Sequence, residues 1–363
     1  MQYDAAIIGG SLAGSTAAIL LAKKGQRVLM LDQAAFPRDK VCGEFLSPAS
    51  RNLLQELQLE DRLIASGAQK IDHVEVAVDS QHHFFKLQNG PALSISRRSL
   101  DQIFQEEAIR QGCEVRNQFE CLQIKEGSPS KLFIRSKLNG LESSVETPCV
   151  INASGSFNRF SKDSIKPSLK KVGFKAHFSS QLKSSAVQLY FFDGGYLGIC
   201  QVENNLTNLC GWLDAKRAKH YGQNFDLLLL EVAKQNKFFA QWLHQSQRKG
   251  EWIFTGHIAL GLTEKATPWF SIGDAFGFVE PFLGQGMTMA IFSGFKVSQF
   301  LKSGSKESKK FSRMMKSQYL KRQIYSNIFH WLTLYPPLFK KSLRYAPWFW
   351  DLSIRSVCSP KKF

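Results

Sequence analysis

The sequence lacks any apolar run of about 18 residues or more, the length that marks a membrane-spanning helix. We therefore predict no membrane span, although 44% of the 363 residues are hydrophobic. The seven cysteines are odd in number and form no C-x-x-C pair. This argues against a disulfide framework or a zinc site and suits a reducing compartment, so we expect a cytoplasmic protein.

Targeting and metal-binding signals are also missing. The first apolar run begins at Tyr3, so we expect no signal or transit peptide ahead of it. The eight histidines are scattered, and the adjacent His82 and His83 lie in an alternating stretch where neighbouring side chains face opposite ways. We predict no metal site. The chain also shows no internal repeat, which argues against a solenoid.

Acidic residues are scarce: 30 Asp and Glu stand against 47 Lys and Arg, a net charge of +17. Residues 302–363 hold 14 of the basic and 2 of the acidic residues, interleaved with many aromatics. Such a segment is typical of three situations: binding to nucleic acid, binding to an anionic membrane surface, or helices that pack on the rest of the protein and leave their lysines in solvent. No nucleic-acid-binding motif is present, so we predict no nucleic acid partner. Packing helices are the first expectation, and peripheral membrane contact is the alternative.

Two glycine-rich segments, far apart in the chain, carry the functional signal. The first, Gly9-Gly10-Ser11-Leu12-Ala13-Gly14, joins a short apolar run to an alanine- and leucine-rich stretch, which predicts a buried strand, a tight turn and a helix. Glycines there let the backbone approach a pyrophosphate at the helix N-terminus. A second predicted strand ends at Asp32, whose carboxylate would bind ribose hydroxyls. Ser11 replaces the middle glycine of G-x-G-x-x-G, which weakens the motif.

The second segment starts with Gly273-Asp274 after another apolar run and ends with Gly284-Gln285-Gly286-Met287 before a predicted helix. A nicotinamide-dependent dehydrogenase would not need this second segment. Two such segments imply a long nucleotide ligand that is held at both ends.

Together these segments resemble the flavoprotein superfamily of para-hydroxybenzoate hydroxylase and geranylgeranyl reductase, over about residues 3–300. The resemblance rests on four motifs: the turn of residues 9–14 with Asp32, the run 36–44 (FPRDKVCGE), the helix start 96–101 (SRRSLD), and the segment 273–286. It implies a mixed α/β fold with a Rossmann-like FAD-binding domain, an inserted antiparallel-sheet substrate domain and a helical C-terminal tail. The domains predicted in this way are residues 1–72, 97–165 and 255–302 for FAD, 73–96 and 166–254 for the substrate, and 303–363 for the basic aromatic tail.

The resemblance also implies which residues bind FAD. Asp274 would bind the ribityl hydroxyls, and the helix that opens at Met287 would face the flavin ring. Arg97 would lie near the phosphates or the ring edge, with a solvated position as the alternative for it or for Arg98. The full predicted set is Gly9, Gly10, Ser11, Ala13, Gly14, Asp32, Arg38, Cys42, Gly43, Arg97, Gly155, Gly273, Asp274, Gly284, Gln285, Gly286 and Met287. Cys42 and Tyr196 are the candidate catalytic residues, and simple packing is the alternative for Cys42.

Departures from the family pattern bear on the reaction. Ser154 stands where the hydroxylases carry Asp in Ala-Asp-Gly, which puts direct use of NAD(P)H in doubt and leaves a separate reductase as the other electron donor. Tyr196 is kept from the reductase motif Y-x-W-x-F-P, but both other bulky groups are lost, so a geranylgeranyl substrate is not implied. The middle of the chain also lacks the W-x-W-x-I-P motif of the related halogenases, which disfavours halogenation.

We therefore predict a FAD-dependent oxidoreductase that acts on a hydrophobic aromatic, polyketide-like or isoprenoid compound. The reaction is monooxygenation or C=C reduction through reduced flavin, and the cofactor motifs do not separate the two. Five aromatic residues would roof an apolar cavity or form the sheet core: Tyr190, Phe191, Phe192, Tyr196 and Trp212. The alternative is a non-catalytic flavin-binding protein that is tethered to a membrane or a partner by its basic tail.

Overall fold

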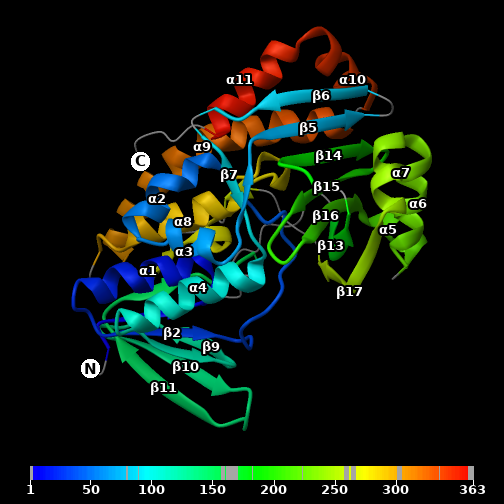
Figure 1. Cartoon of the computed structure of the whole chain (residues 1–363). Coiled ribbons are helices and arrows are strands. Elements are labelled where there is room, and N and C mark those ends of the chain that lie inside the picture. The colour runs from blue at the N-terminus through cyan, green and yellow to red at the C-terminus, as the bar shows by residue number, and fades with distance from the viewer. Residues whose placement is uncertain are drawn as a thin grey trace.

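The computed structural model describes residues 3–78, 81–88, 90–156, 160, 171–181, 183–222, 224–256, 261–262, 267–300, 305–334 and 336–358. The predicted domain boundaries at 165/166 and 302/303 lie outside these residues. The fold is mixed α/β, as expected: helices cover a parallel sheet, a larger mainly antiparallel sheet stands beside it, and the C-terminal helices pack across both (Figure 1).

A five-stranded parallel sheet forms the centre of the nucleotide-binding half. Its order is β19 (Phe270–Ser271), β12 (Val150–Asn152), β1 (Ala5–Ile8), β2 (Val28–Asp32) and β8 (Glu114–Asn117). Strands β1 and β2 are buried throughout and apolar except for Asp32. Helices α1 (Leu12–Lys23), α4 (Arg97–Arg110) and α8 (Gly286–Val297) pack on one face of the sheet, and a small antiparallel sheet packs on the other. The strands run parallel, so the loops that follow β1, β12 and β19 leave the same edge. This places the two glycine-rich segments side by side.

Smaller elements flank this sheet. A three-stranded antiparallel sheet is formed by β9 (Phe119–Lys125), β10 (Ser130–Ser136) and β11 (Glu142–Thr147). Another contains β3 (Phe45–Leu46), β4 (Gln69–Ile71) and β7 (Ala92–Ser94), close to the short helices α2 (Arg51–Glu56) and α3 (Glu60–Ala65).

The second half is a seven-stranded sheet. Its order is β17 (Ser246–Thr255), β13 (Lys171–Ser180), β16 (Leu206–Asp214), β15 (Gly195–Gln201), β14 (Ala186–Phe192), β5 (His73–Val78) and β6 (Gln81–Lys86). All pairs are antiparallel except β14 with β5, which is parallel and joins two stretches far apart in sequence. Helices α5 (Ala215–Tyr221), α6 (Asp226–Gln235) and α7 (Lys237–His244) cover one face, and the other faces the nucleotide-binding half (Figure 1).

Alternation along these strands separates the five aromatic residues that were expected to roof a cavity or fill the core. Tyr190 and Phe192 belong to the core beneath α5–α7. Phe191, Tyr196 and Trp212 face the opposite way, toward the nucleotide-binding half and the C-terminal helices. Two of the five aromatic residues therefore form sheet core, and the other three face the side on which a cavity was expected.

The C-terminal region consists of α9 (Ser305–Leu334), α10 (Pro336–Tyr345) and α11 (Pro347–Cys358). Phe311, Met315 and Tyr319 of α9 are buried in the core of the nucleotide-binding half. Phe339 and Trp350 are buried against the seven-stranded sheet. The side chains of Tyr325, Phe329, Trp331 and Tyr335 lie outside the described residues. None of the helices in the described ranges is long and apolar enough to cross a membrane.

Glu203, in the turn between β15 and β16, connects the two halves. Its carboxylate accepts hydrogen bonds from the backbone N–H of Ser96 (2.8 Å) and the hydroxyl of Ser99 (2.6 Å), at the N-terminus of α4. The hydroxyl of Ser96 donates to it as well. Burial alone would raise the pKa of Glu203, but these hydrogen bonds outweigh burial and lower it. A side chain of the seven-stranded sheet thus fixes the start of α4.

We expect Glu203→Gln to lower the free energy of unfolding by about 1–3 kcal/mol at neutral pH, because buried hydrogen bonds to a charged acceptor are lost. Since the native pKa of Glu203 is lowered, its contribution is present above the unfolded value of about 4.3 and is lost as pH falls through the native value. Urea unfolding at a series of pH values measures this. Glu251→Gln is the control, because that side chain is 96% exposed. Equal stability of the two variants at neutral pH would contradict the assignment.

Candidate functional site

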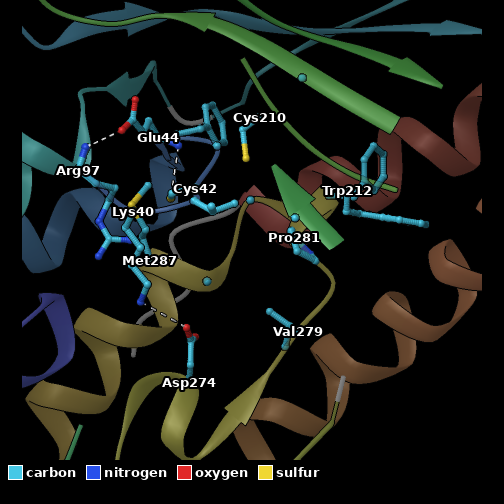
Figure 2. Close-up of a pocket in the computed structure, with 18 of the residues that line it drawn as sticks. Lys40, Cys42, Glu44, Arg97, Cys210, Trp212, Asp274, Val279, Pro281 and Met287 are labelled. Atoms are coloured by element: carbon cyan, nitrogen blue, oxygen red, sulfur yellow. Dashed lines mark hydrogen bonds and ion pairs between the residues drawn. The ribbon is translucent and has the colours of Figure 1, made fainter. Parts of the chain in front are cut away.

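One cavity of about 260 Å³ lies between the two halves (Figure 2). Both glycine-rich segments open onto it, together with the loop before β3 and the inner face of the seven-stranded sheet. Of the predicted site residues, those that line it are Ser11, Ala13, Cys42, Gly43, Arg97, Gly155, Tyr196, Gly273, Asp274, Gly284, Gly286 and Met287. Residues separated by more than 260 positions therefore face one continuous space.

The remaining predicted residues lie behind this lining. A Cβ on Gly14 would lie 1.8 Å from the carbonyl oxygen of Gly9, so only glycine allows this turn to close. The carboxylate of Asp32 accepts hydrogen bonds from the N–H groups of Gly10 (2.7 Å) and Ala34 (2.8 Å), which fixes it beside the turn. The side chain of Gln285 points to Ser47, to which it donates a hydrogen bond of 3.1 Å.

Two helices begin at the cavity with their N–H groups free of side-chain caps. In the described part of the chain, neither Ser11 before α1 nor Gln285 before α8 caps its helix with its own side chain. A helix N-terminus of this kind favours negative charge. Gly43, Gly155 and Gly286 add space, because a Cβ on any of them would meet no described atom within 4 Å. The cavity, with a helix N-terminus at each of two places, thus suits a long ligand that carries negative charge at both places.

Arg97 is buried at the edge of the cavity. Its guanidinium forms two 2.9 Å hydrogen bonds to Asp101 and one of 2.6 Å to the hydroxyl of Ser11. Burial and the charge of Arg97 act in opposite directions on Asp101, and its pKa is lowered. Arg38 lies 3.6 Å from Asp101 and does not line the cavity, and Arg98 is 57% exposed. Of the two arginines at the helix start, Arg97 is therefore the one that faces the site.

Lys40 and Asp274 face each other across the cavity, with their charged atoms 4.0 Å apart (Figure 2). Burial lowers the pKa of Lys40, and the Asp274 carboxylate opposes this in part. Lys40 belongs to residues 36–44, one of the four motifs on which the family resemblance rests, but it was not among the predicted site residues.

Glu44 ends the run of residues 36–44 that resembles the family, but it was not among the predicted site residues. It is fully buried, has a φ of 57°, and lines the cavity. Its carboxylate accepts a hydrogen bond from the N–H of Arg97 (2.7 Å), lies 2.8 Å from Nε2 of His177, and pairs with the ammonium of Lys175. Lys175 and His177 alternate along β13 on its inner face, a pattern of period two that could have indicated them.

Asp39, Glu44 and His177 are close enough to share a metal ion. However, the Lys175 ammonium already pairs with both carboxylates, at 3.5 Å from Asp39. Burial lowers the pKa of Lys175, but the two carboxylates outweigh it and the pKa is raised, so Lys175 stays charged. A lysine therefore supplies the positive charge that a metal would bring, and we assign no metal to this cluster.

The far end of the cavity is apolar. Val74, Val187 and Leu189 line it from β5 and β14, and Phe282 lines it from the loop before α8. Tyr196 is fully enclosed, and burial raises its pKa well above the ordinary value, so its phenol is neutral.

The indole ring of Trp212 lines this end of the cavity and is held in place by two charged residues. Its indole N–H donates a 3.0 Å hydrogen bond to Glu280, and the Lys171 ammonium lies 3.2 Å from the centre of its ring. Burial lowers the pKa of Lys171 to about 8. Neither Lys171 nor Glu280 was predicted from the sequence.

Comparison with known proteins agrees with this geometry. The FAD binding domain family matches residues 2–175. Geranylgeranyl diphosphate reductase of Rhodobacter capsulatus is 33% identical over 159 residues, which are 43% of this chain and 38% of the reductase. The flavin-dependent halogenase armH3 of Armillaria mellea is 23% identical over 344 residues, 81% of this chain and 66% of the halogenase. The matches thus span less than two thirds of either relative's length.

A solved structure shows the same fold. The flavin-dependent brominase Bmp2 superposes with a TM-score of 0.80 at 19% identity, over 99% of this chain and 94% of the brominase. The prediction of FAD as the cofactor is confirmed by the family match. Residues 2–175 thus match the FAD binding domain family, and the chain is similar in sequence to a geranylgeranyl diphosphate reductase and in fold to a flavin-dependent brominase, as the sequence motifs predicted.

Proposed function

We propose that the protein is a FAD-dependent oxidoreductase that acts on a small hydrophobic compound, which is aromatic, polyketide-like or isoprenoid. One observation carries the proposal: the cavity runs without interruption from the glycine-rich segments to an apolar wall that ends at Tyr196 and Trp212. A ligand pocket with mostly apolar walls and a few polar groups is typical of an enzyme site for such compounds.

Bound FAD would supply the redox chemistry, and the chain would supply position and charge. We assign the pyrophosphate to the N-terminus of α1, the ribose to Asp32 and the ribityl chain to Asp274. The N–H groups at the start of α8 would stabilise negative charge on the flavin ring. The predicted domain division follows this assignment, with the nucleotide-binding half holding FAD and the seven-stranded sheet holding the substrate.

Cys42 and Tyr196 are the proposed catalytic residues. The Cys42 sulfur accepts a hydrogen bond of 3.4 Å from the N–H of Glu44, which fixes it at the cavity wall. Tyr196 has a neutral phenol at the apolar end, because burial raises its pKa, and would donate a hydrogen bond to a substrate oxygen.

Two reactions remain compatible with this site: monooxygenation and C=C reduction. The fold is shared with halogenases, but we do not propose halogenation, because the chain lacks their tryptophan motif. Ser154 replaces the hydroxylase aspartate, and we therefore propose a separate reductase as the electron donor, with NAD(P)H as the alternative. The C-terminal region would make peripheral contact with a membrane. If no turnover occurs, the protein is a flavin-binding protein that uses this contact as a tether.

We expect Asp274→Ala to remove most of the bound flavin, because the variant loses the carboxylate that we assign to the ribityl hydroxyls. The yellow colour and the flavin released on denaturation measure this. Asp193→Ala is the control, since that carboxylate is 88% exposed and does not line the cavity. A yellow Asp274→Ala protein with full flavin content would remove this residue from the site.

We expect the holoprotein with a general flavin reductase and NADPH to convert at least one member of a panel of apolar phenols and prenyl alcohols. Mass spectrometry identifies the reaction: a gain of one oxygen means monooxygenation and a gain of two hydrogens means reduction. Omission of the reductase tests direct use of NADPH. Flavin binding without any conversion would favour the non-catalytic alternative.

We expect Glu44→Gln to lower the free energy of unfolding by about 3 kcal/mol or more, because the Lys175 ammonium would be buried without its main counter-charge. The double variant Glu44→Gln/Lys175→Met should be more stable than Glu44→Gln alone. Urea unfolding provides the measurement, and Glu142→Gln, with a 64% exposed side chain, provides the control. If the single and double variants unfold alike, the pair does not hold the site together.

A further inference from the structure

Helix α11 has two faces with different environments. On the inner face, Trp350 is fully buried and packs against the rings of Phe282 and Phe339. Ser353, three residues further on, lines the cavity. On the outer face, Trp348 is 67% exposed and Leu352 is 58% exposed. The thickness of one helix therefore separates the cavity from this apolar outer surface.

The neighbouring helices α9 and α10 also carry exposed apolar residues. Leu338 and Tyr345 of α10 are exposed, and α10 packs next to α11 at one end of the molecule, over β5 and β6 (Figure 1). On α9, exposed Leu320, Ile324 and Ile328 follow one another at intervals of four residues, which places them on one side of the helix. We refer to these seven exposed residues of α9–α11 as the outer apolar face.

Basic residues accompany the outer apolar face. Lys341 and Arg344 are exposed on α10, and residues 302–363 contain 14 basic and 2 acidic residues. A surface that combines exposed Trp, Tyr and Leu with an excess of positive charge is complementary to an anionic bilayer: the aromatics suit the headgroup level, and each nearby Lys or Arg adds attraction.

We propose that the outer apolar face docks on an anionic lipid bilayer and that the substrate reaches the cavity from this bilayer, past α11. The second part rests on the proposed function, because it takes the substrate to be hydrophobic. A compound dissolved in lipid would pass from the side of Trp348 and Leu352 to the side of Ser353 without crossing bulk water. Removal of the whole tail would not test this, since Phe311, Met315 and Trp350 belong to the cores.

Docking is tested by sedimentation of the purified holoprotein with vesicles of phosphatidylglycerol or phosphatidylcholine. We expect binding to the anionic vesicles, weakened by salt, and a loss of about tenfold or more in Trp348→Glu/Leu352→Glu, because two apolar groups become charged. Lys341→Ala/Arg344→Ala should reduce the preference for the anionic lipid. The matched control is Phe84→Glu, which changes a 63% exposed aromatic on β6 that does not belong to the outer apolar face.

Equal sedimentation with both kinds of vesicle would overturn the anionic preference, and an unchanged Trp348→Glu/Leu352→Glu variant would overturn the assigned face. The absence of sedimentation with either lipid would overturn docking and leave a protein as the partner. These outcomes do not depend on flavin or turnover, so failure of docking is distinguishable from failure of the proposed function.

Passage past α11 is tested by labelling cysteines with a lipid-soluble maleimide, in a Cys358→Ser background. Cys42, Cys200 and Cys210 line the cavity, whereas Cys113, Cys121 and Cys149 are buried elsewhere. We expect anionic vesicles to speed labelling of the cavity thiols alone, as mapped by peptide mass spectrometry, and Trp348→Glu/Leu352→Glu to abolish the increase. Equal rates with and without vesicles would overturn passage from the bilayer.

Discussion

The pairing of the buried Glu44 carboxylate with Lys175 and His177 is the constraint on which the site depends. These residues come from the loop before β3 and from β13, and Glu44 also accepts the N–H that begins α4. A charge fully removed from water must keep its partners, because the unpaired group would cost several kcal/mol. The carboxylate therefore holds the seven-stranded sheet over the nucleotide-binding half and sets the space between them. Glu203, from the same sheet, fixes the start of α4 a second time.

The side chains on the inner face of the seven-stranded sheet, which borders the cavity, change from charged to apolar between β13 and β5. The β13 side carries Lys175 and His177, the centre carries the small residues Gly198 and Cys210, and the β14 and β5 side is apolar. The charged cluster around Glu44 thus lies at one side of this face, and the apolar part ends beneath the C-terminal helices, where Lys171 and Glu280 contact Trp212. This gradient is compatible with the proposed site, in which an apolar substrate would lie at the end of the cavity away from the charged cluster.

The parts of the fold that the sequence predicted are those with a local signature. The turn that needs Gly14 and the segment around Asp274 can be read from a few consecutive residues, and parallel strands bring them together. The alternation of Lys175 and His177 indicates that both lie on one face of a strand, but their pairing with Glu44 could not be predicted, because Lys175 is 131 positions away from it. The tail was ambiguous for a related reason: Trp348 and Trp350 look alike in sequence, yet one is exposed and the other buried.

The parallel pairing of β14 with β5 has a consequence for how the chain acquires its structure. The hairpin of β5 and β6 precedes its neighbour in the sheet by more than a hundred residues, and the central sheet of the other half is completed only by β19. Neither sheet can be completed until most of the polypeptide has been synthesised, and contacts between residues so far apart in sequence form slowly. A fragment of residues 2–175, the range that matches a domain family, would therefore carry strand edges with nothing to pair with: β12 would lack β19, and β5 would lack β14.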